Sequence, residues 1–206
     1  MNIPPSILKP ILFYGGGGHA AVAAEVVEAQ ARYRLIGLVA DTTPGREWNV
    51  PYLGQYQAHL HPEAEIILAF GSNQGRAQAA SILQHTPAVL VHPSAIISPS
   101  ATISQGMVIY HGAIIQAGTT IGQHTIMNTG ARIDHDCRIA DFVHVAPGTT
   151  LCGNVEVGEG SFIGAGATVI PGIKIGRWAT IGAGACVVKD VADGQMVTGV
   201  PARVRG

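Results

Sequence analysis

An aliphatic residue or methionine returns at every sixth position through the second half of this chain of 206 residues. The sixteen members of the series are Ile97, Ile103, Ile109, Ile115, Ile121, Met127, Ile133, Ile139, Val145, Leu151, Val157, Ile163, Val169, Ile175, Ile181 and Val187. With roughly half of the chain hydrophobic, chance alone would make all sixteen positions apolar about one time in tens of thousands. A six-residue period therefore governs the fold of this half.

The neighbours of these positions carry a second pattern. The residue two places earlier is mostly small, and the residue that follows is often glycine. A hexapeptide repeat of this form predicts a parallel β-helix, in which each unit is a short strand plus a turn and three units close one triangular coil. Because strand side chains alternate, the repeated residue and the small residue two before it should both point inward. The sixteen units predict about five coils.

The first half of the chain follows a different pattern. The segment ILFYGGGGHAAVAAEVVEAQ (11–30) combines an apolar strand, a glycine turn and a helix, and YRLIGLVAD (33–41) is a second strand. A third strand, glycine turn and helix follow in AEIILAFGSNQGRAQAASILQ (64–84). Alternating strands and helices predict a small Rossmann-like parallel sheet. We therefore expect an N-terminal domain over residues 1–90 and a β-helix domain with a C-terminal tail over 91–206.

Several polar groups should converge at the carboxyl ends of these strands, where parallel sheets bind their ligands. Consecutive glycines at a strand–helix junction let a ligand approach the backbone, and the N-terminus of the following helix suits a phosphate. The same glycines suit a plain tight turn, and an aspartate after the second strand suits a simple cap. The residues predicted to hold a nucleotide sugar are Gly16, Gly17, Gly18, His19, Asp41 and Asn73.

Composition narrows the classes of partner. Only 12% of the residues are charged and the net charge is −1, so nothing favours nucleic acid or an anionic membrane surface electrostatically. No run of about 18 consecutive apolar residues occurs, and a membrane span is not expected. The first ten residues, MNIPPSILKP, lack the features of a signal peptide, and the three cysteines form no metal-binding spacing. We expect a reduced, cytoplasmic setting.

The stretch IDHDCRIADFVHV (133–145) places His135 between two acids, Asp134 and Asp136. Neighbouring carboxylates make an imidazole more basic and hold its orientation. A neutral imidazole of this kind can take a proton from an attacking ammonium or hydroxyl group. The alternative is a solvated histidine on the wall of the β-helix, because most isolated surface histidines have no chemical role.

A metal centre is the other use of histidines on a β-helix. Ligands on adjacent coils would be separated by about 18 residues, the length of three hexapeptides. The separations between His111, His124, His135 and His144 are instead 13, 11 and 9. The sequence therefore predicts no metal site.

Taken together, these motifs resemble the PglD/NeuD family of hexapeptide-repeat sugar acetyltransferases over nearly the whole chain. The matching segments, in the family's order and spacing, are YGGGGHA, AFGSNQGR, IDHDCRIADFVHVAPGTTLCGNVEVG, FIGAGATVIPGIKIG and VTGVPAR. The resemblance implies that the β-helix is left-handed and that acetyl-coenzyme A is the co-substrate. It also implies a homotrimer with active sites between subunits.

The resemblance also assigns roles to individual residues. His135 would be the general base, and Asp136 would orient or polarise it. Asp136 is one methylene shorter than the glutamate of several family members, which puts its hydrogen bond to His135 in question. The residues implied for acetyl-coenzyme A are His144, Gly153, Ala165 and Ala183, with Lys189, Arg203 and Arg205 near its adenine or 3′-phosphate end.

The predicted activity is N-acetylation of the 4-amino group of a nucleotide-linked 4-amino-4,6-dideoxyhexose in bacterial glycan biosynthesis. The amine would attack the thioester directly, without a covalent enzyme intermediate. Two alternatives stay open, namely O-acetylation of sialic acid or a related sugar, and a non-catalytic β-helix scaffold that assists a partner. The glycine turn, Asp41 and Asn73 favour N-acetylation of a nucleotide-linked sugar, because together they are typical of a nucleotide pocket.

Overall fold

The computed structural model describes residues 8–205, so most of the segment considered as a signal peptide lies outside the described part. Residues 9–80 contain the expected parallel sheet, with strand order β2-β1-β3. Its elements are β1 (Lys9–Tyr14), α1 (Gly18–Gln30), β2 (Tyr33–Val39), β3 (Glu65–Leu68) and α2 (Asn73–Ala80). The predicted Rossmann-like arrangement is confirmed. Within the described part, no helix is long and apolar enough to cross a membrane.

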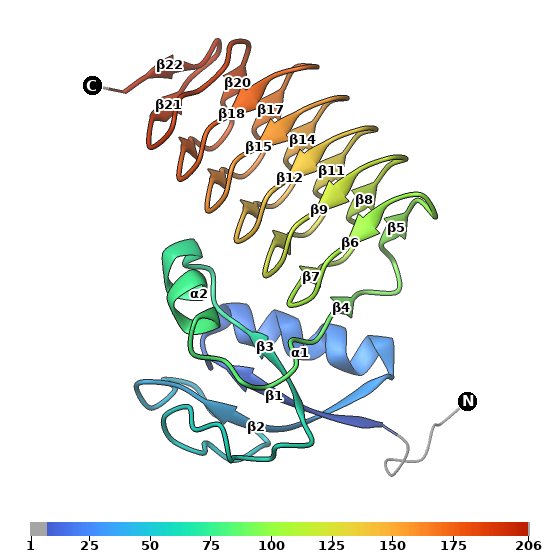
Figure 1. The fold of residues 1–206 in the computed structure, drawn as a ribbon, viewed down its shortest axis with the longest axis vertical. Coiled ribbons are helices and arrows are strands. Elements are labelled where there is room, and N and C mark those ends of the chain that lie inside the picture. Colours follow the sequence, from blue (N-terminus) through green and yellow to red (C-terminus); the bar gives the residue numbers. More distant parts are fainter. Residues whose placement is uncertain (1–7, 206) are drawn as a thin grey trace.

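The rest of the chain winds into a parallel β-helix with three faces (Figure 1). The β13 face consists of β4 (Leu90–Val91), β7 (Val108–Ile109), β10 (Ile126–Met127), β13 (His144–Val145), β16 (Phe162–Ile163), β19 (Thr180–Ile181), β21 (Met196–Thr198) and the antiparallel β22 (Arg203–Val204). The β11 face consists of β5 (Ile96–Ile97), β8 (Ile114–Ile115), β11 (Arg132–Ile133), β14 (Thr150–Leu151), β17 (Thr168–Val169) and β20 (Cys186–Val187). The β12 face consists of β6 (Thr102–Ile103), β9 (Thr120–Ile121), β12 (Arg138–Ile139), β15 (Glu156–Val157) and β18 (Lys174–Ile175).

The repeated residues point inward as predicted, and those from Ile109 to Val187 are buried. The eighteen parallel strands make six coils rather than the expected five. One extra strand, β4, precedes the series, and another, β21, follows it. Beyond Val187 the next buried residue is Val191, only four positions later. The six-residue period therefore ends at Val187, whereas the β-helix continues beyond it.

Hydroxyl groups at the small inward position are buried without being left unpaired. Each donates a hydrogen bond to the carbonyl oxygen 15 residues further along the chain, in the next coil. These pairs are Thr119 to Asp134, Thr125 to Ala140, Thr149 to Gly164 and Ser161 to Gly176. Because buried polar groups are costly only when they lack partners, the apolar interior accepts these residues.

Each coil turns at three corners. At the corners between residues 106 and 184, one residue is left-handed, with φ between 52° and 77°. Equivalent residues recur every 18 positions and stack along the helix. The α2 corner contains Gly106, His124, Phe142, Gly160 and Trp178; the glycine corner contains Gly112, Gly130, Gly148, Gly166 and Gly184; the His135 corner contains Gly118, Asp136, Asn154 and Gly172.

One of the buried apolar clusters spans the two domains. Ile11, Phe13 and Ala20 of the N-terminal domain pack in the same buried cluster as Val108 and Tyr110 of the β-helix. Figure 1 shows α1 between the sheet and the first coils, and α2 beside the coils. Burial of this shared cluster fixes α1 and one face of the sheet against the β13 face.

Candidate active site

His135 and Asp136 form a hydrogen-bonded pair on the outside of the His135 corner. The distance between His135 Nδ1 and Asp136 Oδ2 is 2.8 Å, and the two side chains are 53% and 60% exposed. Asp136 adopts φ of 59°, a left-handed conformation that aspartate tolerates better than most residues. The shorter aspartate therefore makes the hydrogen bond that the sequence comparison put in question.

The acids around His135 determine its proton affinity and its tautomer. The hydrogen bond to Asp136, and then the charge of Asp134, raise the pKa of His135 above its ordinary value of 6.5. The Asp136 carboxylate accepts a hydrogen bond from Nδ1–H of the neutral ring, which leaves the lone pair on Nε2 for a substrate proton. This is the geometry of a general base held by an orienting carboxylate.

Two glycines make room for this pair. A Cβ at Gly153, one coil above His135, would lie 2.6 Å from both Cε1 and Nε2 of the imidazole. A Cβ at Gly118, one coil below Asp136, would lie 2.5 Å from Asp136 Oδ1. A hollow of about 320 Å³ opens beside the pair and is lined by Gly118, Asp136, Arg138, Asn154 and Glu156. Asp136, the hydrogen-bond partner of His135, thus lines a hollow at the surface.

Thr119 supports the turn that carries the pair. Its buried hydroxyl donates to the carbonyl of Asp134 at 2.8 Å and accepts from the amide of Cys137 at 3.2 Å. These two bonds bracket residues 135 and 136 from the coil below. Sequence reasoning missed this role, because threonine at the small inward position differs little from its alanine equivalents.

Replacing Thr119 by valine should lower kcat of the proposed transfer by about 10- to 100-fold, because an ångström-scale shift of a catalytic group has that order of effect. Steady-state thiol release checks this result, and Thr119→Ser should restore most of the rate. Ser161→Ala is the matched control, since the Ser161 hydroxyl brackets residues 176–179 in the same way, far from His135. Equal rate losses in the valine and alanine variants would contradict the role of Thr119.

A second hollow lies at the carboxyl end of the N-terminal sheet, and we call it the glycine-turn hollow. It measures about 610 Å³ and brings together residues that are distant in sequence. Gly16, Gly17 and Asp41 line it, as predicted positions for a nucleotide sugar, together with Tyr14 and residues of α2. The Tyr14 hydroxyl donates to Asp41 Oδ1 at 2.9 Å, and burial, followed by this bond, raises the pKa of Tyr14 to about 12. Tyr14 therefore holds one oxygen of the Asp41 carboxylate.

The glycines of the turn serve different purposes. A Cβ at Gly16 would lie 2.6 Å from Pro44, so this residue permits the loop after β2 to cover the turn. Gly17 and Gly18 have open space at the N-terminus of α1, where no side chain of the described residues provides a cap. In α2, by contrast, Ser72 caps the amide of Gly75. The uncapped amides of α1 suit an anionic group such as a diphosphate.

Asn73 does not line the glycine-turn hollow. Its Nδ2 donates to the carbonyls of Gly160 and Ser161 at 2.9 and 3.0 Å, and its Oδ1 accepts from Arg76. The side chain therefore faces the β-helix, with its polar atoms engaged there. The sequence expectation placed it at the strand end, but α2 begins at Asn73 and turns this residue away from the sheet edge.

His19 and His144 meet at the interface between the domains instead of in either hollow. Their ring centroids are 6.1 Å apart, His19 Nε2 lies 2.9 Å from the Tyr110 hydroxyl, and His144 Nε2 lies 3.1 Å from Asn128 Nδ2. Asn128 Oδ1 accepts from the amide of Thr129, so its Nδ2 must donate to His144. His144 is therefore the Nδ1–H tautomer when neutral.

Both interface histidines are held neutral. Burial is the main cause, and the charge of Arg76 is the second; together they lower the pKa of His19 and of His144 to about 4 from 6.5. The unfolded chain therefore binds protons that the folded chain excludes. The resulting stability is complete above about pH 6.5 and is lost as the pH falls through about 4.

We expect the free energy of unfolding to fall by about 3 kcal/mol per histidine across this range. Denaturant unfolding at several pH values measures it. His144→Gln should remove the contribution of His144, about 3 kcal/mol, whereas replacement of the exposed His59 by glutamine should leave that contribution in place. An identical pH profile for His144→Gln would mean that His144 is not the group that titrates.

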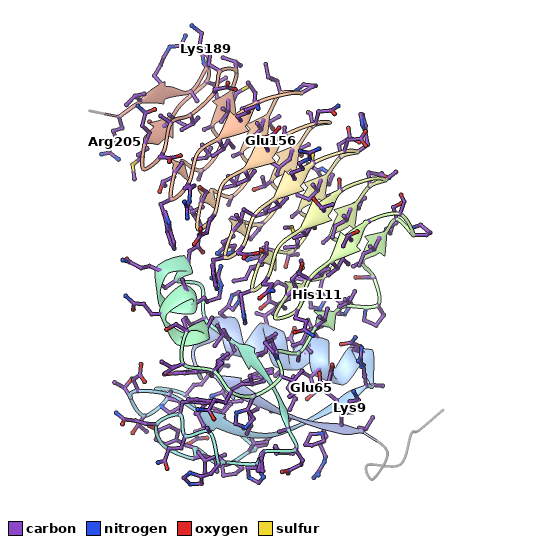
Figure 2. All side chains as sticks on the ribbon, in the orientation of Figure 1. Lys9, Glu65, His111, Glu156, Lys189 and Arg205 are labelled. Atoms are coloured by element: carbon purple, nitrogen blue, oxygen red, sulfur yellow. The ribbon has the colours of Figure 1, made fainter. Side chains whose placement is uncertain are left out.

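The residues implied for acetyl-coenzyme A lie at different corners and faces of the β-helix within one chain. Gly153 is on the His135 corner, whereas Ala165 and Ala183 precede the glycines of the glycine corner, and the β11 face separates these corners. His144 is on the β13 face. Figure 2 shows Lys189 and Arg205 at the end of the β-helix remote from the N-terminal domain. Residues 8–205 contain no group of three or more His, Cys, Asp or Glu arranged to hold a metal ion.

Comparisons with known proteins agree with both halves of this description. Residues 10–83 match the PglD N-terminal domain, and residues 136–171 and 154–189 match the bacterial transferase hexapeptide, a unit of six repeats. The UDP-N-acetylbacillosamine N-acetyltransferase of Bacillus subtilis (strain 168) is 41% identical over 114 residues. That match spans 50% of this chain and 51% of the relative, about half of each.

Solved structures match over a longer range. The acetyltransferase domain of PglB from Neisseria gonorrhoeae FA1090, also solved with acetyl coenzyme A, is 39% identical with a TM-score of 0.90, covering 96% of this chain and 100% of that one. PerB from Caulobacter crescentus, in complex with CoA and GDP-perosamine, is 36% identical with a TM-score of 0.87, covering 97% and 98%. With this identity over nearly their whole length, the chain belongs to the PglD/NeuD family of hexapeptide-repeat sugar acetyltransferases.

Proposed function

We propose that this chain transfers the acetyl group of acetyl-coenzyme A to the 4-amino group of a nucleotide-linked 4-amino-4,6-dideoxyhexose, with His135 as general base. The observation that carries the proposal is the His135–Asp136 pair, whose Nε2 is free beside Gly153 on an exposed corner. The relatives add support, because they act on or bind amino sugars carried by UDP or GDP.

The chemistry is a direct aminolysis of a thioester. The sugar nitrogen attacks the acetyl carbonyl carbon, a C–N bond forms, and the C–S bond breaks to release the thiolate of coenzyme A. His135 Nε2 takes the proton that the nitrogen loses and can pass it to the departing sulfur. The charge of Asp136 stabilises the imidazolium that exists between these two transfers.

The glycine-turn hollow is the proposed site of the nucleotide. Its open helix N-terminus would bind the diphosphate, and Asp41, held by Tyr14, would accept a hydrogen bond from the base or ribose. Asn73 is left out of this site because it contacts the β-helix. We expect the reaction to occur in the cytoplasm, since the three cysteines are free thiols.

The separation of the predicted donor residues supports a site shared between copies of the chain. A cofactor lying along a seam would contact the His135 corner of one copy, with Gly153, and the glycine corner of another, with Ala165 and Ala183. A homotrimer with three such seams satisfies this requirement and is the assembly that the family resemblance implies. Sedimentation of the purified chain tests it directly.

The activity is tested by incubating the full chain with acetyl-coenzyme A and a panel of acceptors. The panel contains UDP-, GDP- and dTDP-linked 4-amino sugars and free sialic acid. We expect thiol release with a nucleotide amino sugar, and a product heavier by one acetyl group. Release with sialic acid alone would replace this proposal by O-acetylation. Failure of calorimetry to detect acetyl-coenzyme A binding would instead favour a non-catalytic scaffold.

A further inference from the structure

Helix α2 has two functional faces. Gly75, Gln78 and Ala79 line the glycine-turn hollow. Asn73 and Arg76, on the other side of the same helix, contact the β-helix at the α2 corner. The helix is therefore a direct physical connection between the proposed nucleotide site and the coils that carry the transfer chemistry.

The contacts of α2 follow a column of main-chain carbonyls. His124, Phe142 and Gly160 occupy the same position in three successive coils, and all three are left-handed. Their amides join the hydrogen-bond ladder between coils, through Gln105, Gln123 and Asp141, but no main-chain amide among the described residues bonds to their carbonyl oxygens. The α2 corner thus presents a regular row of acceptors, one per coil.

Two side chains bind three consecutive members of this row. Arg76 Nε donates to the carbonyl of His124 at 3.0 Å, and its Nη2 donates to that of Phe142 at 2.9 Å. Asn73 Nδ2 donates to the carbonyl of Gly160 at 2.9 Å. A further bond of 2.9 Å, from Arg76 Nη2 to Asn73 Oδ1, joins the two side chains. We call this pair the Asn73–Arg76 clamp.

The clamp joins the two domains through a buried charge, which costs free energy. Arg76 is 1% exposed, and its hydrogen-bond partners are carbonyl and amide oxygens; among residues 8–205, no carboxylate pairs with it. A buried charge without a counter-ion costs free energy that an apolar contact would avoid. What the clamp provides instead is register, because its donors match the spacing of the carbonyls and fit only at defined steps along the row.

Register matters for the proposed chemistry. A slip of the N-terminal domain by one coil would move a bound sugar by about 4.8 Å, the spacing of adjacent strands. Acyl transfer requires the attacking atom to be held within a fraction of an ångström of its productive position. The clamp also reaches the nucleotide side directly, since Arg76 Nη1 donates to the carbonyl of Phe70, a residue that lines the glycine-turn hollow.

We propose that the Asn73–Arg76 clamp is a positioning element that sets the register of the nucleotide-sugar domain along the β-helix, so that the acceptor amine reaches the acetyl carbon. This inference rests on the proposed function. Asn73 and Arg76 touch neither the reacting atoms nor the hollow, and act through the placement of α2.

The test compares two acceptors in each variant. A nucleotide-linked amino sugar depends on the N-terminal domain for its position, whereas the same amino sugar without its nucleotide reaches the β-helix without that domain. Asn73→Asp removes the donor to Gly160 but keeps the acceptor for Arg76, and Arg76→Lys keeps the charge but loses the planar fork. Gln74→Glu, the same amide-to-acid change at the exposed neighbouring position, is the matched control.

We expect kcat with the nucleotide-linked acceptor to fall by at least about tenfold in both clamp variants. The rate with the free amino sugar, and nucleotide-sugar affinity by calorimetry, should change less than about twofold, as should both rates in Gln74→Glu. Equal losses with both acceptors would show a purely structural role and overturn the inference, as would no loss with either. Absence of transfer in the unmodified chain would instead refute the proposed function. If Arg76→Lys fails to fold, Asn73→Asp decides alone.

Discussion

The substitution His135→Ala should lower kcat/KM for acetyl transfer by about 10²- to 10⁴-fold, the range that general-base catalysis contributes. The alanine cannot accept the proton that the sugar nitrogen loses, while the surface corner around it should keep its fold because the His135 side chain is exposed. Affinity for acetyl-coenzyme A, measured by calorimetry, should change little. His59→Ala, at an exposed position in the N-terminal domain, is the control and should keep full activity. An active His135→Ala variant would remove His135 from the mechanism.

The pH profile tests the same assignment without deleting the base. His135 acts only when its Nε2 is unprotonated, so kcat/KM should fall on the acid side of its pKa. Asp136 and Asp134 raise that pKa, which places the acid limb above pH 6.5. In Asp136→Asn the main cause of the raised pKa is lost, and the limb should move to lower pH while the maximal rate decreases. An acid limb at the same pH in both proteins would mean that another group titrates.

The substitution Gly153→Ala should lower kcat by about 100-fold although it adds one methyl group. The new Cβ would lie 2.6 Å from Cε1 and Nε2 of His135, closer than non-bonded atoms approach, so the imidazole must move. A displacement of this size separates the base from the amine and weakens its bond to Asp136, and misplacement by about 1 Å has effects of this order. Stability should change little, because the exposed ring can swing into solvent. Steady-state kinetics and thermal unfolding measure the two effects.

Gly112→Ala is the matched control and should show the opposite pattern. Gly112 has φ of 64° and no atom within 4 Å of an added Cβ, so alanine there strains the backbone by about 1 kcal/mol without touching a functional group. We expect lower stability and unchanged kinetics for Gly112→Ala. If Gly153→Ala retained the full rate, the space that Gly153 leaves for the His135 imidazole would have no catalytic importance.

The β-helix and the His135–Asp136 hydrogen-bonded pair can both be predicted from the sequence, because each follows from local geometry. The inward position recurs because strand side chains alternate and a coil takes three equal units, so Ile109 and its equivalents reveal the fold through local geometry alone. His135 and Asp136 are adjacent in the chain, and their contact needs no distant element. The end of the helix was harder to predict, because the step from Val187 to Val191 breaks the period that identified it.

Contacts across the domain interface could not be predicted in this way. Asn73 was expected to contact a nucleotide because it follows a strand, yet it bonds to Gly160, 87 residues away in sequence. The role of Arg76, whose partner His124 is 48 residues away, was not foreseen at all. The coils, the glycine turn and the His135–Asp136 pair can be predicted from the amino-acid pattern, since each follows from a regular repeat or from residues close together in the chain. The contacts of Asn73 and Arg76 emerge only from the folded chain, because they depend on how the N-terminal domain packs against the β-helix.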